Sequence, residues 1–353
     1  MLFENNQLDK RVYEEELKDY LPKKIIDIHT HLWRKKDVGV IPVDPNAPVG
    51  WPSLVADENT IEDLKETYTI MFPDKEVKAL MFAMTTKDRA LLEKRNEYVR
   101  DSAEQTGFPA LYFSHPEQTA EEIEKKVLNG GFLGVKSYLS LANPSIAPSD
   151  VRILDFFPHH QLKKLNEMGA IVMCHIPRSL RFRDPQNLAD LKEIATKYQN
   201  LKFIVAHIGR AYIPSDLGNA LEYLSACKNL LYDFCANTSD YVMQKTLESV
   251  GAKRLMFGSD LPILRMKMKR IEDNGIYVNL VPPHIYGDVS YDKNMRVVSE
   301  EEGAKLTYFM YEEIRAMKKA TTNLGMEKED IEDLFYNNAN ELLENTRKTL
   351  YNV

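Results

Sequence analysis

The stretch Ile25-Ile26-Asp27-Ile28-His29-Thr30-His31 decides the fold, because it joins a strand pattern to two histidines. It is short and rich in β-branched residues, which predicts a buried strand. Side chains alternate along a strand, so Ile26 and Ile28 are expected on one face. Asp27, His29 and His31 are expected on the opposite face. Two imidazoles placed two residues apart on one face of a strand can reach a single cation.

Short apolar runs recur along the chain, and most precede a longer charged stretch that is compatible with a helix. The eight runs are Ile25–His29, Val77–Ala83, Ala110–Ser114, Leu133–Tyr138, Ala170–His175, Lys202–His207, Leu230–Cys235 and Arg254–Gly258. Strands that alternate with helices imply parallel pairing and right-handed crossovers. A doubly wound open sheet explains this alternation equally well. Eight units, and polar residues at several strand ends, favour an α/β fold of the (β/α)8 TIM-barrel type.

We expect a single domain over residues 1–353, with the barrel at about 24–262. Two stretches exceed the barrel plan, and they are long loops after strands 1 and 8, at residues 33–59 and 262–299. Both leave the carboxyl ends of strands, where barrel enzymes build their sites, so 263–299 is interpreted as a loop or lid. Residues 300–347 are expected to form extra C-terminal helices outside the barrel.

Composition limits the partners and the compartment. The net charge of −7 argues against nucleic acid, which requires a basic surface. No apolar run approaches the roughly 18 residues of a membrane helix, and residues 1–20 do not resemble a signal peptide. Three cysteines without CxxC spacing fit a reducing compartment. We therefore expect a cytoplasmic protein that acts on a small molecule without a membrane. The sequence leaves open whether the chain forms a homo-oligomer.

Polar residues stand where several predicted strands end. They are His29, His31, His175, His207 and Asp260, and Lys136 lies in the fourth strand. In a closed barrel these ends form a ring around one mouth. Three imidazoles and one carboxylate suit Zn²⁺ best, with Mn²⁺, Fe²⁺ or Co²⁺ as alternatives. A lone histidine at a strand end is more often a hydrogen-bonded core residue, so the prediction depends on the whole set.

Several other residues have open roles. Lys136 is compatible with a carbamylated bridging ligand, a substrate-binding cation or a lysine paired with Asp or Glu inside the barrel. Arg178 follows His175 closely, and a guanidinium there can clamp a substrate carboxylate or form a salt bridge to a neighbouring loop. His115 is placed to line a pocket. His159, His160 and His284 are interpreted as surface or loop residues.

Four motifs in order resemble the amidohydrolase superfamily. They are Ile26-Asp27-Ile28-His29-Thr30-His31, His175, Ala206-His207-Ile208-Gly209 and Phe257-Gly258-Ser259-Asp260-Leu261-Pro262. The resemblance is strongest to the amidohydrolase-2 branch, which includes aminocarboxymuconate-semialdehyde and resorcylate decarboxylase types. It implies a distorted (β/α)8 barrel with a mononuclear divalent metal held by His29, His31, His175 and Asp260. It makes His207 an acid/base or substrate-polarising residue, or a second-metal ligand in a binuclear variant. Arg210 and the 263–299 loop depart from the branch pattern.

These observations predict a metal-dependent hydrolase that cleaves a C–N or C–O bond through a metal-activated water. Asp260 would accept the proton of the water, and His207 would stabilise the oxyanion or protonate the leaving group. Arg178, Arg210 and Lys136 are the predicted substrate-binding cations, and the two arginines suggest a carboxylated substrate. Non-oxidative decarboxylation by a lyase is the alternative reaction. A non-catalytic metal-binding barrel is the third possibility.

Overall fold

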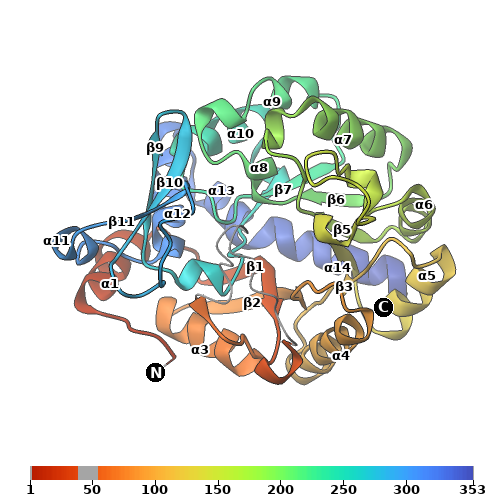
Figure 1. Cartoon of the computed structure of the whole chain (residues 1–353), viewed down its shortest axis with the longest axis horizontal. Coiled ribbons are helices and arrows are strands. Elements are labelled where there is room, and N and C mark those ends of the chain that lie inside the picture. The colour runs from red at the N-terminus through yellow and green to blue at the C-terminus, as the bar shows by residue number, and fades with distance from the viewer. Residues whose placement is uncertain (1, 39–54, 353) are drawn as a thin grey trace.

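The computed structural model describes residues 2–38 and 55–352, and its central feature is a ring of parallel strands surrounded by helices (Figure 1). The strands of the ring are β1 (Lys24–Leu32), β2 (Glu76–Ala83), β3 (Tyr112–Phe113), β4 (Gly134–Ser137), β5 (Ile171–Cys174), β6 (Lys202–Val205), β7 (Leu230–Asp233) and β8 (Leu255–Met256). Neighbours pair in chain order. Backbone bonds from Leu111 N to Met81 O and from Ile28 N to Phe257 O, at 2.9 and 3.0 Å, complete the ring. The predicted α/β fold is confirmed, and the arrangement of the strands is consistent with the predicted TIM-barrel type.

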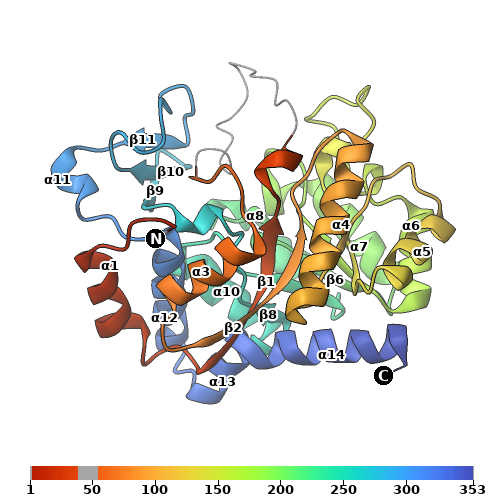
Figure 2. The same cartoon turned by 90° about the horizontal axis from the view of Figure 1, so that it is seen from below.

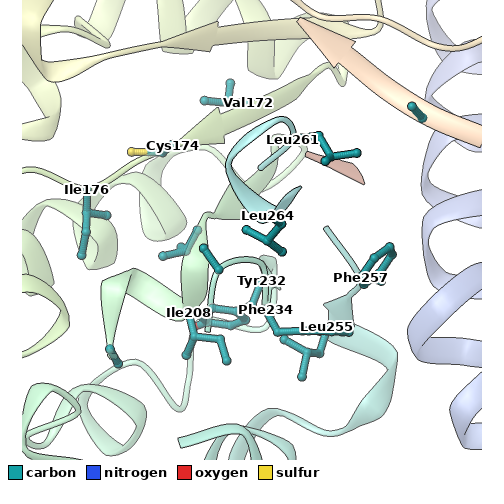
Figure 3. Close-up of a cluster of buried hydrophobic side chains, with 14 of the residues drawn as sticks. Val172, Cys174, Ile176, Ile208, Tyr232, Phe234, Leu255, Phe257, Leu261 and Leu264 are labelled. Atoms are coloured by element: carbon teal, nitrogen blue, oxygen red, sulfur yellow. The ribbon is translucent and has the colours of Figure 1, made fainter. Parts of the chain in front are cut away.

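Side chains of the ring strands alternate between two apolar clusters. In β5, Ile171 and Met173 pack inside the ring, whereas Val172 and Cys174 pack outward (Figure 3). Both faces of such strands are buried, as expected for parallel strands covered by helices. The inner cluster also contains Leu343 of the last helix, α14 (Asn338–Tyr351). Figure 2 shows this helix lying across one end of the ring, so α14 closes the barrel there.

The helices surround the ring, as the sequence predicts. They are α3 (Ile61–Met71), α4 (Arg89–Thr106), α5 (Ala120–Asn129), α6 (His159–Met168), α7 (Pro185–Lys197), α9 (Ala220–Tyr223) and α10 (Asp240–Val250). The short segment α8 (His207–Arg210) is a turn whose residues have positive φ. The helix α9 is short, and Gly218 just before it adopts a left-handed conformation with φ +49°. None of the helices in the described part of the chain is long and apolar enough to cross a membrane.

The chain ends add further helices to the barrel. They are α1 (Gln7–Val12), α11 (Glu300–Gly303), α12 (Phe309–Asn323), α13 (Lys328–Glu332) and α14. The N-terminal and C-terminal helices meet, since Arg315 of α12 forms an ion pair with Glu16. The prediction of C-terminal helices over 300–347 is confirmed. One of them, α14, also covers one end of the barrel.

The segment after β8 is a small sheet and not the predicted loop. It contains β9 (Lys269–Asp273), β10 (Ile276–Val281) and β11 (Met295–Val297). Asn274 and Gly275 have φ values of 52° and 78° in the tight turn between β9 and β10. This matches a two-residue hairpin turn with two left-handed residues. Figure 2 shows the sheet at the opposite end of the molecule from α14. Most of the other expected loop, 33–59, lies outside the described residues.

The first strand departs from simple alternation. Its pairing with β2 shifts register between Asp27 and Thr30. Asp27 consequently lies on the outer side of the ring, where it accepts a hydrogen bond from the Tyr68 hydroxyl at 2.8 Å. His29 and His31 turn inward, with ring centroids 5.1 and 4.6 Å from that of Phe82. The prediction that Asp27 shares a face with the two histidines is therefore wrong, and the cause is this irregularity.

Glu313 on α12 makes stability depend on pH. It is fully buried, and neither carboxylate oxygen has a hydrogen bond of normal geometry within the described residues, although the backbone N–H groups of Ala236 and Asn237 lie close to it. Burial, with the nearby carboxyls of Asp27 and Asp233, raises its pKa well above 4.5. Folding therefore takes up a proton, so stability falls as pH rises from the unfolded-state pKa toward the folded-state pKa. We expect Glu313→Gln, which stays neutral, to gain about 1.4 kcal/mol relative to wild type per pH unit.

Urea unfolding at about pH 5.5, 6.5 and 7.5 measures this gain. Glu248→Gln is the control, because the Glu248 carboxylate is paired with Lys245 at 2.7 Å on the surface. Its stability relative to wild type should change little over the same range. An equal effect of Glu313→Gln at every pH would contradict the prediction.

Candidate metal centre

A cavity of about 510 Å³ opens where the carboxyl ends of the ring strands meet the β9–β11 sheet. Residues within or just after all eight ring strands reach it, and the sheet supplies the outer wall. Its lining includes His29, His31, Phe113, Lys136, Tyr138, His175, His207, Arg210, Tyr212, Asp260, Arg270, Tyr277, Asn279 and Phe309. In barrel folds this face is the place where catalytic residues from different strands meet.

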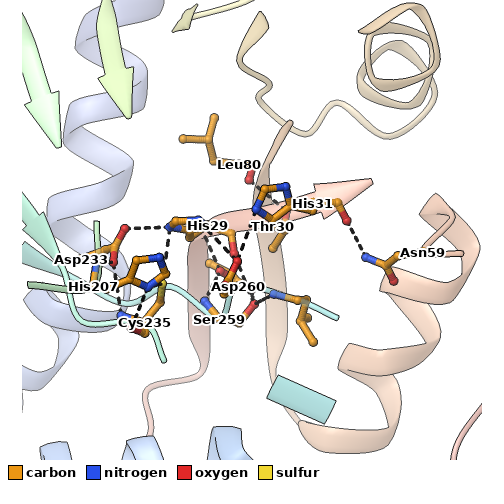
Figure 4. Close-up of polar contacts among 12 residues, drawn as sticks. His29, Thr30, His31, Asn59, Leu80, His207, Asp233, Cys235, Ser259 and Asp260 are labelled. Atoms are coloured by element: carbon orange, nitrogen blue, oxygen red, sulfur yellow. Dashed lines mark hydrogen bonds and ion pairs between the residues drawn. The ribbon is translucent and has the colours of Figure 1, made fainter. Parts of the chain in front are cut away.

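Two histidines and one aspartate converge at the floor of the cavity (Figure 4). Asp260 Oδ1 lies 3.3 Å from His31 Nε2 and 3.6 Å from His29 Nε2. One ligand atom from each of these residues lies within 4.8 Å of the other two. The predicted convergence of β1 with the segment after β8 is thus present, held by a bond from Asp260 N to His29 O at 2.8 Å.

In both His29 and His31, the other ring nitrogen, Nδ1, already has a hydrogen-bond partner. His29 Nδ1 lies 2.9 Å from Asp233 Oδ2, and His31 Nδ1 lies 3.1 Å from the carbonyl oxygen of Ala83. Both partners are acceptors, so each Nδ1 carries the proton in the neutral ring and each Nε2 presents a lone pair. Two lone pairs then face the Asp260 carboxylate, and three acceptors facing one another are satisfied by a proton or a metal ion between them. The carboxylate–histidine arrangement at His29 is typical of metal sites.

His175 and His207 lie beside this group, in the same cavity. Their ring centroids are 5.3 Å apart, and that of His207 is 4.9 Å from that of His29. His175 Nδ1 is buried without a hydrogen-bond partner among the described residues. The three-residue group defined above does not include His175. An imidazole with a nitrogen that has no partner is suited to act here as a further ligand of a metal ion.

His207 is held by the end of β7. Its Nδ1 lies 3.1 Å from the carbonyl oxygen and 2.9 Å from the thiol sulfur of Cys235. Its backbone N–H donates to Asp233 Oδ1 at 2.6 Å. Burial lowers the pKa of His207 to about 4, and the neighbouring Asp260 only partly opposes this. The imidazole is therefore neutral at pH 7.

The backbone after β6 is folded tightly to place His207. Residues 207–210 all have positive φ, and Ile208, a β-branched residue, has φ 47°. Such strain clusters at functional sites. Gly209 is required there, since a Cβ would lie 2.4 Å from Phe182. The predicted strand ends at Val205, and His207 stands in this turn and not on the strand.

Asp260 and Asp233 carry the negative charge of the site. Burial alone would raise the pKa of Asp260, but the surrounding imidazoles of His31, His29 and His207 hold the pKa below 3.8. The pKa of Asp233 is likewise lowered, because His29 outweighs the effect of burial. Both carboxyls are therefore ionised at neutral pH. Asp260 has φ 52°, which turns its side chain into the mouth after β8.

Of the three predicted substrate-binding cations, two lie in the cavity. Lys136 and Arg210 line it. Arg178 does not, because its Nε is paired with Asp184 Oδ1 at 2.9 Å. The salt-bridge alternative for Arg178 is the one the structure contains, and its role as a substrate clamp is corrected. Lys136 forms no ion pair with a described carboxylate, and burial lowers its pKa.

Other histidines lie away from the centre. His115 Nδ1 pairs with Glu117 at 2.9 Å and does not line the cavity, so its predicted place there is wrong. His284 is exposed and pairs with Glu300, as its interpretation as a loop residue implies. His159 begins α6, so it lies in a helix, and it does not line the cavity.

The sequence analysis missed several residues of the site. Asp233 and Cys235 end the seventh predicted strand, so the rule that polar residues gather at strand ends could have found them. Arg270 and Tyr277 come from the β9–β10 hairpin, which Asn274-Gly275 signals. Tyr212 follows the strained turn at residues 207–210, and no local sequence pattern marks it.

A barrel with histidines and an aspartate at the carboxyl mouth defines a class of metal-dependent enzymes. The family model described as amidohydrolase matches residues 26–344, so the chain belongs to the amidohydrolase family. The resemblance found in the four motifs is confirmed. No curated protein is significantly similar to the chain in sequence.

Solved structures with the same fold are distant in sequence. A probable 2-pyrone-4,6-dicarboxylic acid hydrolase from Acinetobacter baumannii, with citric acid bound, is 16% identical, with TM-score 0.55 and coverage of 91% of this chain and 99% of that one. An amidohydrolase from Burkholderia multivorans with bound zinc is 11% identical, with TM-score 0.55 and coverage of 91% and 99%. A dihydroxybenzoic acid decarboxylase from Polaromonas sp. JS666, with bound manganese and 2-nitroresorcinol, is 16% identical, with TM-score 0.52 and coverage of 94% and 100%. These identities establish the fold alone.

Proposed function

We propose that the protein is a metal-dependent hydrolase that cleaves a C–N or C–O bond of a small carboxylated molecule. The convergence of His29, His31 and Asp260 in one cavity carries the proposal, since one ligand atom from each can reach a single metal ion. His175 completes the ligand set. Zn²⁺ suits this N/O set, with Mn²⁺ as the alternative, and relatives in fold hold both metals. A bound ion of this kind supplies charge that polarises a carbonyl and acidifies water.

The side chains have separate roles in this proposal. Asp260 is ionised, so it can accept a proton from water while it lies against the two histidines. His207 is neutral and held at Nδ1 by Cys235, so its Nε2 remains for the reacting oxygen or the leaving group. Lys136 and Arg210 attract the substrate carboxylate. Asp233 orients His29 and is a positioning residue.

Decarboxylation by a lyase is the second candidate. The buried Lys136, without an ion-pair partner among the described residues, is suited to hold a carboxylate beside the centre. One relative in fold is a decarboxylase that contains manganese. Decarboxylation needs an acid that protonates carbon, whereas hydrolysis begins with a base that takes a proton from water, and the ionised Asp260 can serve as that base. The state of Asp260 therefore favours hydrolysis. A barrel that binds metal without catalysis is the third candidate. The acid/base groups Asp260 and His207 in the same cavity disfavour it.

A compound panel tests the proposal. The zinc-loaded protein is incubated with carboxylated amides, lactones and esters, and with hydroxybenzoic acids. We expect a new carboxylate with release of amine or alcohol, and no CO₂. Release of CO₂ in place of these products would favour the lyase. Full turnover by a His207→Asn variant would refute the proposed role of His207 and favour the non-catalytic alternative.

A further inference from the structure

We propose that the β9–β10 hairpin builds a second anion subsite around Arg270, so that the substrate is a small dicarboxylate. The inference deepens the proposed function, on which it rests, by naming the class of substrate. One carboxylate, or the group derived from it, lies at the metal end of the cavity. The other lies against Arg270 at the end formed by the hairpin.

Arg270 is rigidly held in the cavity wall. Its Nε donates to Asn279 Oδ1 at 2.8 Å, and its Nη1 donates to the carbonyl oxygen of Ala236 at 2.5 Å. The guanidinium carbon lies 4.4 Å from the ring centroid of Tyr212 and 4.8 Å from that of Tyr277. Neither of its two bonds uses Nη2. A guanidinium fixed in this way loses little freedom when it binds a carboxylate.

The charges of the cavity do not balance. Of the lining residues, Lys136, Arg210 and Arg270 are basic, and Asp260 is the one acidic side chain. Within the described residues, 2–38 and 55–352, no carboxylate forms an ion pair with any of the three cations. Buried charges without partners cost several kcal/mol in general, and a substrate anion removes that cost. The divalent metal of the proposed function adds further positive charge. A single carboxylate leaves most of this excess in place, whereas a second carboxylate brings the amount offset to about half.

The two anion positions belong to one continuous wall. The His207 ring centroid lies 6.5 Å from that of Tyr212, and the Tyr212 centroid lies 5.1 Å from that of Tyr277. Tyr212 therefore separates the histidine end of the cavity from the Arg270 end. Arg210 follows β6. Its Nη1 donates to the carbonyl oxygens of Ile176 and Arg178, which follow β5, at 3.2 and 3.1 Å. Its Nε is buried without a described partner.

Calorimetric binding to the zinc-loaded protein tests the subsite without turnover. The probes are two matched pairs, isophthalate with benzoate and glutarate with butyrate. We expect at least one dicarboxylate to bind wild type about 10-fold or more tightly than its monocarboxylate. Arg270→Met should weaken that dicarboxylate by about 10- to 100-fold and change the monocarboxylate by less than about 3-fold. Arg296→Met is the control, because Arg296 pairs with Asp273 in the same sheet, outside the cavity lining.

Each outcome decides the proposal. Equal affinity of wild type for both members of each pair would overturn it, as would an equal loss for both in Arg270→Met. If Arg270→Met does not fold, Arg270→Lys keeps a charge without the planar fork, and a selective loss of about 5-fold or more is expected. A selective loss in a protein without hydrolase activity would keep the subsite and reject the proposed function. Hydrolase activity in wild type, together with an equal loss of affinity for both members of each pair in Arg270→Met, would keep the proposed function and reject the subsite.

Discussion

Simultaneous replacement of His29 and His31 by alanine should abolish metal binding. We expect purified wild type to carry about one divalent metal per chain, and His29→Ala/His31→Ala to carry less than about a tenth of that. The physical reason is that both Nε2 atoms face Asp260 Oδ1, at 3.6 and 3.3 Å. Without the imidazoles, one carboxylate and His175 remain, too few ligands for a stable zinc site. Inductively coupled plasma mass spectrometry measures the content directly.

The matched control is His159→Ala/His160→Ala, a second pair of histidines close in sequence. It lies on α6, outside the cavity lining, and should retain the full metal content. Circular dichroism of both double variants separates loss of metal from loss of fold. A near-zero metal content in wild type after growth with added zinc would reject the metal centre, as would equal content in the wild type and the His29→Ala/His31→Ala variant.

The sequence could predict the barrel and its mouth because both depend on short-range patterns. The apolar runs mark all eight ring strands, and the HxH spacing marks His29 and His31. The chain brings Asp260 to them because β8 closes onto β1, which the rule of parallel α/β rings implies. Irregularities within a single strand could not be predicted from these patterns. The register shift that separates Asp27 from His29 depends on Tyr68 and Ser259, which lie far away in sequence.

The substrate end of the cavity could not be predicted in the same way. Arg178 and Arg270 are both arginines in loops or edge strands. The local sequence does not show which of them pairs with a carboxylate of the protein. Arg178 pairs with Asp184, six residues away along the chain. Arg270 instead lies between Tyr212 and Tyr277, which come from different parts of the fold. Such a cage forms only by tertiary packing, so a three-dimensional structure was needed to identify it.

Asp260→Asn should nearly eliminate turnover while the protein remains folded. Asparagine keeps the shape of the side chain and removes the negative charge and the proton acceptor. We expect kcat to fall by about 10³-fold or more, since general-base catalysis alone contributes about 10²- to 10⁴-fold and the charge also helps to hold the metal. The substrate is the one that the compound panel identifies. Activity and metal content are measured on the same preparation, so that loss of the base is distinguished from loss of the ion.

Two further variants make the reason for the loss visible. Asp260→Glu restores the carboxylate at a longer reach and should recover part of kcat, whereas a purely structural role would leave it as inactive as Asp260→Asn. Asp233→Asn keeps Asp260 and weakens the orientation of His29, to which Asp233 Oδ2 lies at 2.9 Å. We expect it to lower metal affinity by about 10- to 100-fold, the usual effect of removing such a partner. If Asp260→Asn keeps full metal content and more than about a tenth of the wild-type kcat, Asp260 is not the base, and His207 becomes the residue that must accept the proton.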